Sequence, residues 1–234
     1  MKIITLAGFE QVKTAMANVA ESHPEWFPKG FNEIHAVSND GFFAAVNGGD
    51  YFISNAQALV KGFNPAHTLI EAISKASNGE LLTFNQEYSI ETLWHEIMHG
   101  RTGIGGERLL VAQEPVSEGF IQLSARHTYQ ILLKALGGRA QHLDSIITGG
   151  LSYPVVTRNL LELITEAGIT GEEVERILIA NGENWQVAMK EKLSVALNTK
   201  RVGSLLNAAS SSDLNGFKQK IKMQQRNAPL RSKE

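Results

Sequence analysis

The sequence predicts an α+β fold, with a small and mainly antiparallel sheet, one histidine-bearing helix, and a helical C-terminal half. Three segments, 33–38, 41–46 and 51–54, are rich in β-branched and aromatic residues and are separated by Asn, Asp and Gly turns. Residues 89–100 have helical periodicity and contain the pattern His-Glu-x-x-His. Beyond residue 115, helical patterns follow one another through short loops, which predicts antiparallel helical neighbours.

Composition limits the chemistry that the chain can support. The 234 residues are 43% hydrophobic and 20% charged, enough for one good-sized domain or two small lobes. The absence of cysteine excludes disulfides, cysteine-bound zinc and a cysteine nucleophile, so any metal must be held by His and carboxylate side chains. The net charge of −2 gives no clear indication of nucleic-acid binding. With no signal peptide or membrane span recognised, we expect a cytoplasmic protein.

The N-terminal part, residues 1–105, is predicted to be the sheet-containing lobe. An amphipathic helix is expected from Phe9 to about Glu21, followed by a three-stranded antiparallel meander and a second helix over 65–77. Residues 81–84 suggest a further short strand. Such a strand could line the site and take an extended peptide by strand addition, or it could be an ordinary core strand.

The His-Glu-x-x-His helix is expected over residues 89–100, with Ser89 as N-cap and Gly100 as its stop. His95 and His99 lie one turn apart, so both imidazoles can reach one metal ion. Glu96 projects from nearly the same face and can reach a water on that metal. The alternative is a buried helix with two incidental histidines.

A catalytic zinc site needs a third protein ligand and one open position. The nearby candidates are Glu107, Glu114 and Glu118. Pro115 is favoured at the first position of a helix, and we expect that helix to run to about Leu136. Glu114 and Glu118 then share one face, where one carboxylate could bind the metal and the other could orient an imidazole. This helical lobe is predicted to span residues 106–210.

His-Glu-x-x-His followed by Glu-x-x-x-Glu-x-Phe on the next helix resembles the gluzincin metallopeptidases, such as thermolysin-like enzymes and the anthrax lethal factor peptidase domain. The resemblance implies a zincin-like sheet and a zinc cofactor bound by His95, His99 and Glu114. It makes Glu96 the general base and Glu118 the partner that orients a ligating histidine. The gap between His99 and Glu114 is shorter than that family leads us to expect.

The expected function is a zinc metallopeptidase that cleaves a peptide or protein substrate with a metal-activated water. Tyr153, in the glycine-rich loop before Pro154, is the candidate for holding the oxyanion, although it could simply pack a helix entrance. His127, Tyr129 and Arg158 are weaker rivals. The alternatives are a zinc hydrolase of a non-peptide or cell-wall amide, and a non-catalytic metal-stabilised binding module of a phage or mobile-element system.

Three more helices are expected over 154–168, 171–180 and 185–197, and residues 211–234 read as a basic tail. A capping pattern, Thr170-Gly171-Glu172-Glu173, should start the second of these helices. No membrane partner is expected, and the sequence leaves cleavage specificity and oligomeric state open.

Overall fold

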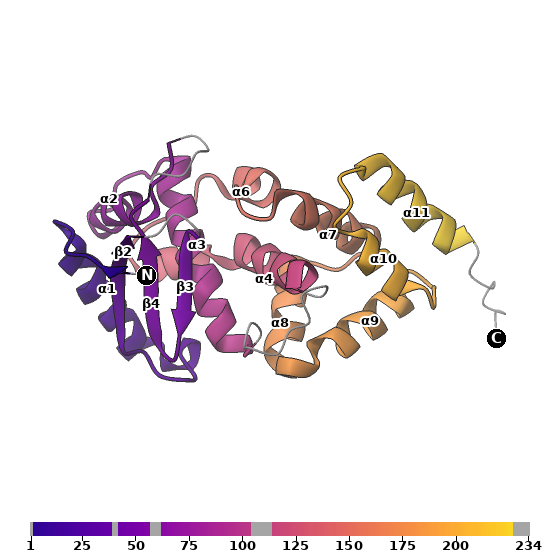
Figure 1. The fold of residues 1–234 in the computed structure, drawn as a ribbon, viewed down its shortest axis with the longest axis horizontal. Coiled ribbons are helices and arrows are strands. Elements are labelled where there is room, and N and C mark those ends of the chain that lie inside the picture. The colour runs from indigo at the N-terminus through magenta and orange to yellow at the C-terminus, as the bar shows by residue number, and fades with distance from the viewer. Residues whose placement is uncertain (1, 39–41, 57–61, 104–113, 227–234) are drawn as a thin grey trace. The chain divides into compact units, whose positions relative to one another are not determined.

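The computed structural model describes residues 2–38, 42–56, 62–103 and 114–226. These residues contain eleven α-helices and a four-stranded mixed sheet, which confirms the α+β class with a helical majority (Figure 1). The chain divides into two compact units. The first comprises residues 1–103 and 125–151, and the second comprises residues 104–124 and 152–234.

The sheet of the first unit has the strand order β1-β2-β4-β3. Its strands are β1 (Lys2–Ile3), β2 (Glu33–Ser38), β3 (Ala44–Asn47) and β4 (Asp50–Ser54). The β3–β4 hairpin closes through Gly48 and Gly49, whose φ angles of 60° and 94° suit glycine. The predicted hairpin turn at residues 47–50 is therefore confirmed.

The predicted antiparallel meander is wrong in one pairing. β2 pairs with β4 in parallel, and β3 lies at the sheet edge, antiparallel to β4. The burial of the strands explains this order. β2 and β4 carry the fully buried side chains of Ile34, Val37, Tyr51 and Ile53, whereas β3 is mostly half-buried or exposed. The two most apolar strands thus occupy the interior of the sheet.

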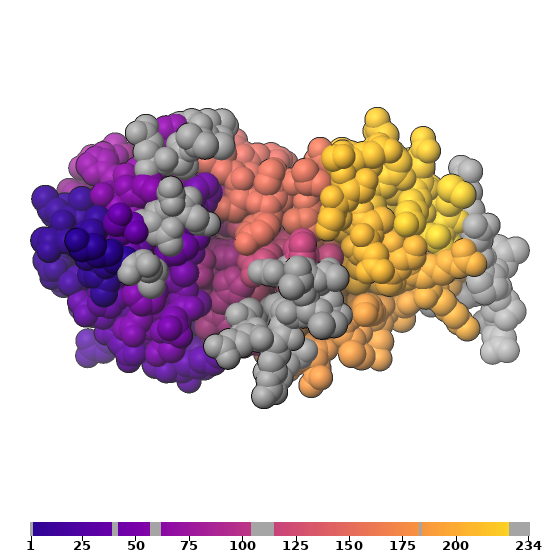
Figure 2. Space-filling model, viewed as in Figure 1, coloured from indigo at the N-terminus to yellow at the C-terminus, as the bar shows by residue number. Residues whose placement is uncertain are grey.

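Helices α1 (Phe9–Ser22) and α2 (Pro65–Ser77) match the predicted segments closely. Each buries one apolar stripe, as an amphipathic helix should. Asn64 caps α2 by accepting a hydrogen bond from the backbone of His67. Together with the strands they form one closely packed body, drawn indigo to purple in the space-filling view (Figure 2).

The histidine helix, α3 (Phe84–Thr102), is longer than predicted at both ends. Thr83 and Gln86 form a reciprocal capping box, so the chain enters the helix at Phe84 and the strand expected over 81–84 does not exist. Ser89 lies inside the helix and is not its N-cap. Gly100 does not stop the helix, which ends instead at Gly103 with a left-handed φ of 68°.

Helix α3 is a core helix with little exposed surface. Its side chains from Gln86 to Met98 are all buried, including the polar stripe that contains His95 and Glu96. The helix also packs beside the edge strand β3 (Figure 1). Eight buried polar or ionisable side chains lie on this one helix: Gln86, Glu87, Ser89, Glu91, Thr92, His95, Glu96 and Thr102. Buried polar groups need partners, and such clusters often mark functional sites.

Helix α4 (Glu114–Thr128) is followed almost directly by α5 (Gln130–Ala135), close to the predicted single helix over 115–136. Its residues from Ala125 onward belong to the first unit, as do α5 and α6 (Leu143–Gly149). The turn after α5 uses Gly137, whose φ of 89° is a backbone conformation that favours glycine.

The second unit is helical beyond α4. It contains α7 (Pro154–Glu166), α8 (Gly171–Asn181), α9 (Trp185–Ala196), α10 (Val202–Ala208) and α11 (Leu214–Arg226), and the short 3-10 helix η2 (Gly182–Asn184). A second short 3-10 helix, η1 (Pro24–Trp26), belongs to the first unit. Thr170 caps α8 by accepting a hydrogen bond from the backbone of Glu173, which confirms the predicted start of this helix.

Part of the expected basic tail, residues 214–226, is helix α11. Across the described ranges, no helix has the length and apolar character to cross a membrane.

Candidate metal centre

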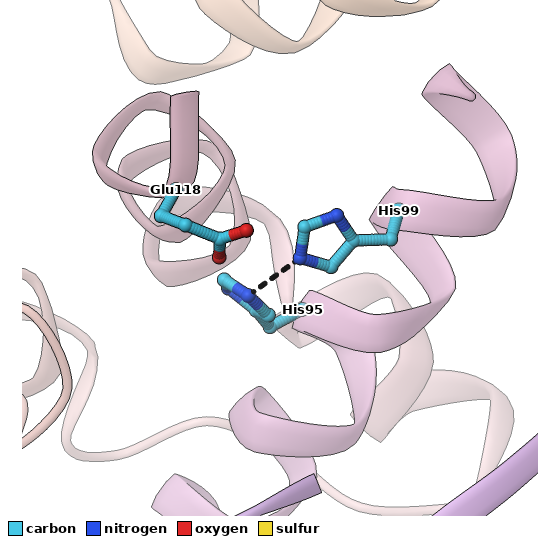
Figure 3. Close-up of side chains that lie close together, drawn as sticks. All are labelled: His95, His99 and Glu118. Atoms are coloured by element: carbon cyan, nitrogen blue, oxygen red, sulfur yellow. Dashed lines mark hydrogen bonds between the residues drawn. The ribbon is translucent and has the colours of Figure 1, made fainter. Parts of the chain in front are cut away.

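Two histidines on α3 direct the same ring atom toward a common point. The Nε2 atoms of His95 and His99 lie 3.0 Å apart, and the two rings are inclined by 76° (Figure 3). Two nitrogen ligands of a tetrahedral zinc, each at about 2.0–2.1 Å, would lie about 3.3 Å apart. The one-turn spacing of the motif therefore produces a pair of imidazoles that can share a metal with only a small adjustment.

A carboxylate completes the group. Ligand atoms of His95, His99 and Glu118 all lie within 4.8 Å of one another, and Figure 3 shows the three side chains pointing toward one another. His95 is buried, while His99 and Glu118 are half-buried. Two imidazoles and one carboxylate are a donor set that suits zinc and leaves a coordination position open.

The other carboxylates considered for the third ligand are placed differently. Glu107 lies outside the described residues. Glu114 is the first residue of α4, but its side chain lies outside the description, so its predicted role as a ligand stays a prediction. Glu118, expected to orient a histidine, is the carboxylate grouped with the two imidazoles.

Glu96, the expected general base, is largely withdrawn from solvent, with 8% of its surface exposed. It lies next to His95 in sequence and one turn before Gly100. Its charge acts on Tyr51 of β4, where burial, and then the negative charge of Glu96, raise the pKa of the tyrosine hydroxyl. Glu96 and Tyr51 are therefore close enough to interact within the first unit.

The N-terminal half of α3 is anchored by a buried carboxylate. Glu87 is fully buried and accepts hydrogen bonds from the Tyr129 hydroxyl at 2.5 Å and from the backbone of Gln141 and His142 at 2.7 and 3.2 Å. Burial and the hydrogen bond to Glu87 raise the pKa of Tyr129. This network fixes the N-terminal half of α3 against the connection between α5 and α6.

A second anchor lies beside the motif itself. Trp94 is fully buried, and its Nε1 donates to Thr128 Oγ1 at the end of α4 over 2.9 Å. Trp26 packs edge-on against Trp94, with ring centroids 5.0 Å apart, and the guanidinium of Arg101 lies 5.3 Å from the Trp94 ring centroid. These contacts fix the helix rotation that turns His95 and His99 to one side.

The residues considered for oxyanion stabilisation have distinct surroundings. Tyr153 precedes α7 in the left-handed region with a φ of 48°, and 43% of its surface is exposed. The Tyr129 hydroxyl is engaged by Glu87. Arg158 donates to the Ser212 carbonyl within the second unit. The role of Tyr153 stays a prediction, and these contacts make Tyr129 and Arg158 weaker rivals.

Tyr51 is a residue near the site that the sequence did not indicate. The sequence predicts it only as part of a strand, although it lies beside the histidine helix and interacts with Glu96. The available signal was alternation: Tyr51 and Ile53 share the face of β4 that should pack on a helix. Alternation could not say which helix, because that depends on the tertiary packing.

Comparison of the chain with known protein families, with curated proteins and with solved structures finds no match.

Proposed function

We propose that this protein is a zinc-dependent metallopeptidase in which His95, His99 and Glu118 bind the metal and Glu96 is the general base. The observation that carries the proposal is the convergence of two imidazoles and one carboxylate, with ligand atoms within 4.8 Å of one another. The Glu of the His-Glu-x-x-His pattern lies between those histidines in sequence.

The donor set favours zinc over other metals. The chain contains no cysteine, and hard cations such as magnesium prefer sites built from oxygen ligands. A site with two nitrogen donors and one carboxylate matches the three protein ligands of a hydrolytic zinc site, which leaves the fourth position for chemistry.

Zinc held there would polarise the substrate carbonyl and lower the pKa of water from 15.7 to about 7. Glu96 would accept the proton from the attacking water and return it to the leaving nitrogen, so that amine and carboxylic acid form as the amide bond breaks. Glu96 is only 8% exposed, so few bulk water molecules can compete with its carboxylate for that proton.

A peptide substrate is favoured by the neighbouring sheet edge. β3 lies at the edge of the sheet and packs beside α3. An extended peptide can add to an edge strand through main-chain hydrogen bonds, and a compact non-peptide amide cannot. In this proposal β3 is the strand that binds the extended peptide, a role that the sequence analysis considered for residues 81–84.

The test uses the purified full chain, its zinc content and its action on an unstructured protein such as casein. We expect about one zinc per chain and measurable cleavage. Glu96→Gln should lower cleavage at least a hundredfold while zinc stays bound, because it removes only the base. Glu80→Gln, an exposed substitution before α3, is the matched control and should leave cleavage unchanged. Undiminished cleavage by Glu96→Gln would refute the assignment of the base.

The third ligand has its own test. Glu118→Ala should abolish stoichiometric zinc binding, whereas Glu114→Ala should lower zinc affinity by no more than about 10–100-fold, the range seen for residues that only support a ligand. His67→Ala, which alters an exposed histidine on α2, controls for nonspecific loss of zinc. The opposite ranking of Glu114 and Glu118 would make Glu114 the ligand, as the resemblance implies.

A further inference from the structure

The aromatic side chain of Tyr51 is held rigidly inside the first unit. Tyr51 is 2% exposed, and its ring packs against Phe27 and Phe31, with ring centroids 5.9 and 5.7 Å away. The ring of Phe27 meets it edge-on, and the ring of Phe31 stacks on it. With its ring enclosed in this way, Tyr51 presents its hydroxyl in one fixed direction.

That direction is toward the histidine helix. A Cβ atom placed on Gly100 would lie only 3.2 Å from the Tyr51 hydroxyl oxygen, closer than side chains normally approach. Gly100 is an interior residue of α3, where glycine is unfavourable by about 1 kcal/mol relative to alanine. Because Gly100 has no side chain, the Tyr51 hydroxyl can lie directly against the helix.

Glu96 lies on the same stripe of α3. Residues four apart on a helix are neighbours on one face, so a group that rests on Gly100 stands one turn from Glu96. The electrostatic effect of Glu96 on Tyr51 agrees with this placement, as does the burial of both side chains. Since burial and the Glu96 charge both raise the pKa of Tyr51, the hydroxyl keeps its proton and remains a donor throughout the physiological range.

We propose that Tyr51 is a positioning residue for Glu96, with its hydroxyl admitted to the helix by Gly100 and acting on the carboxylate one turn away through one water. A mostly buried carboxylate is stabilised by a fixed donor, which also limits the rotamers it can adopt. The proposal rests on the proposed peptidase function, in which Glu96 must face the attacking water. In this role Tyr51 would act through Glu96 and not on the substrate itself.

The activity test compares Tyr51→Phe, Gly100→Ala and the double variant, all loaded with zinc. Tyr51→Phe should lower kcat about tenfold or more with KM and zinc content unchanged. Gly100→Ala should lower both the melting temperature and kcat, because its Cβ displaces the hydroxyl. The double variant removes that clash, so it should regain the melting temperature while kcat stays low. Recovery of kcat in the double variant, or a wild-type kcat in Tyr51→Phe, would overturn the proposal.

A second measurement is independent of cleavage. In a cycle of Tyr51→Phe, Glu96→Gln and their double variant, the two shifts in melting temperature should be clearly non-additive, because the hydroxyl and carboxylate interact. Additive shifts would overturn the proposal whether or not the protein cleaves peptides. Non-additive shifts in a wild-type protein that binds zinc but cleaves nothing would refute the peptidase function and retain the Tyr51–Glu96 interaction.

Discussion

The indole nitrogen of Trp94 donates a hydrogen bond to Thr128 Oγ1 over 2.9 Å, joining the histidine helix to the end of α4. Trp94 immediately precedes His95, and Thr128 lies on the helix that carries Glu118. Both residues belong to the first unit, so this bond holds the turn of α3 that carries the motif against the C-terminal end of α4.

Thr128→Val should destabilise the protein by about 1–3 kcal/mol, because it leaves the buried Trp94 N–H without its acceptor. Zinc affinity should fall as well, since the variant weakens an anchor of the helix that carries His95 and His99. Chemical denaturation and zinc competition measure the two effects. Thr148→Val, an exposed substitution on α6, is the control and should change stability by less than about 0.5 kcal/mol. Equal effects of the two variants would contradict the anchoring role.

Tyr129→Phe should cost about 1–3 kcal/mol, because buried Glu87 loses one of its donors. It should also weaken the alkaline dependence of stability. The pKa of Tyr129 is raised in the folded state, so its contribution is complete below the usual tyrosine pKa of about 10 and is lost as pH rises above it. Urea denaturation between pH 7 and 11 measures both effects. A variant with an unchanged alkaline slope would contradict the assignment.

The position of the C-terminal end of α3 can be tested with two glycine-to-alanine substitutions that should change stability in opposite directions. Gly103 has a φ of 68°, and a Cβ added to it would meet no other atom, so Gly103→Ala should cost about 1 kcal/mol through backbone strain alone. Gly203 lies in helix α10 with ordinary φ and open space, so Gly203→Ala should be neutral or stabilising by up to about 1 kcal/mol. Thermal unfolding gives both values. A stabilising Gly103→Ala would place the helix end elsewhere.

The start of α3 separates the observed cap from the expected one. Thr83→Ala should destabilise the protein by about 0.5–2 kcal/mol, because the backbone N–H of Gln86 loses its acceptor. Ser89→Ala should cost less, since the Ser89 hydroxyl only donates to the Gln86 carbonyl inside the helix. Denaturation of both variants under the same conditions decides the order. A larger loss at Ser89 would restore the N-cap expected from the sequence.

The sequence allowed the helices with distinct boundary signals to be predicted well. α2 has Pro65 at its first turn and Asn78-Gly79 after its end, and α8 has its Thr170 cap, so local chemistry marks where both begin and stop. The start of α3 was missed because the apolar pair Leu81-Leu82 read as a strand and hid the Thr83–Gln86 capping box. The parallel pairing of β2 with β4 was missed because chain neighbours were expected to be sheet neighbours.

The site was predictable to the extent that it is local. His95 and His99 are brought together by helix periodicity alone, and no tertiary information is needed for that pair. Glu114 and Glu118 also share a face by periodicity, but periodicity cannot choose between them. That choice depends on contacts between residues far apart in the sequence. Tyr51 was missed for the same reason.

The most direct measurement is anomalous diffraction at the zinc edge from crystals of the full chain grown with zinc. We predict one peak about 2.0–2.1 Å from the Nε2 atoms of both His95 and His99 and about 2.0–2.2 Å from a carboxylate oxygen of Glu118, with one position free of protein ligands. A peak elsewhere, no peak between the two imidazoles, or a fourth protein ligand closing the site would contradict a catalytic metal centre in this protein.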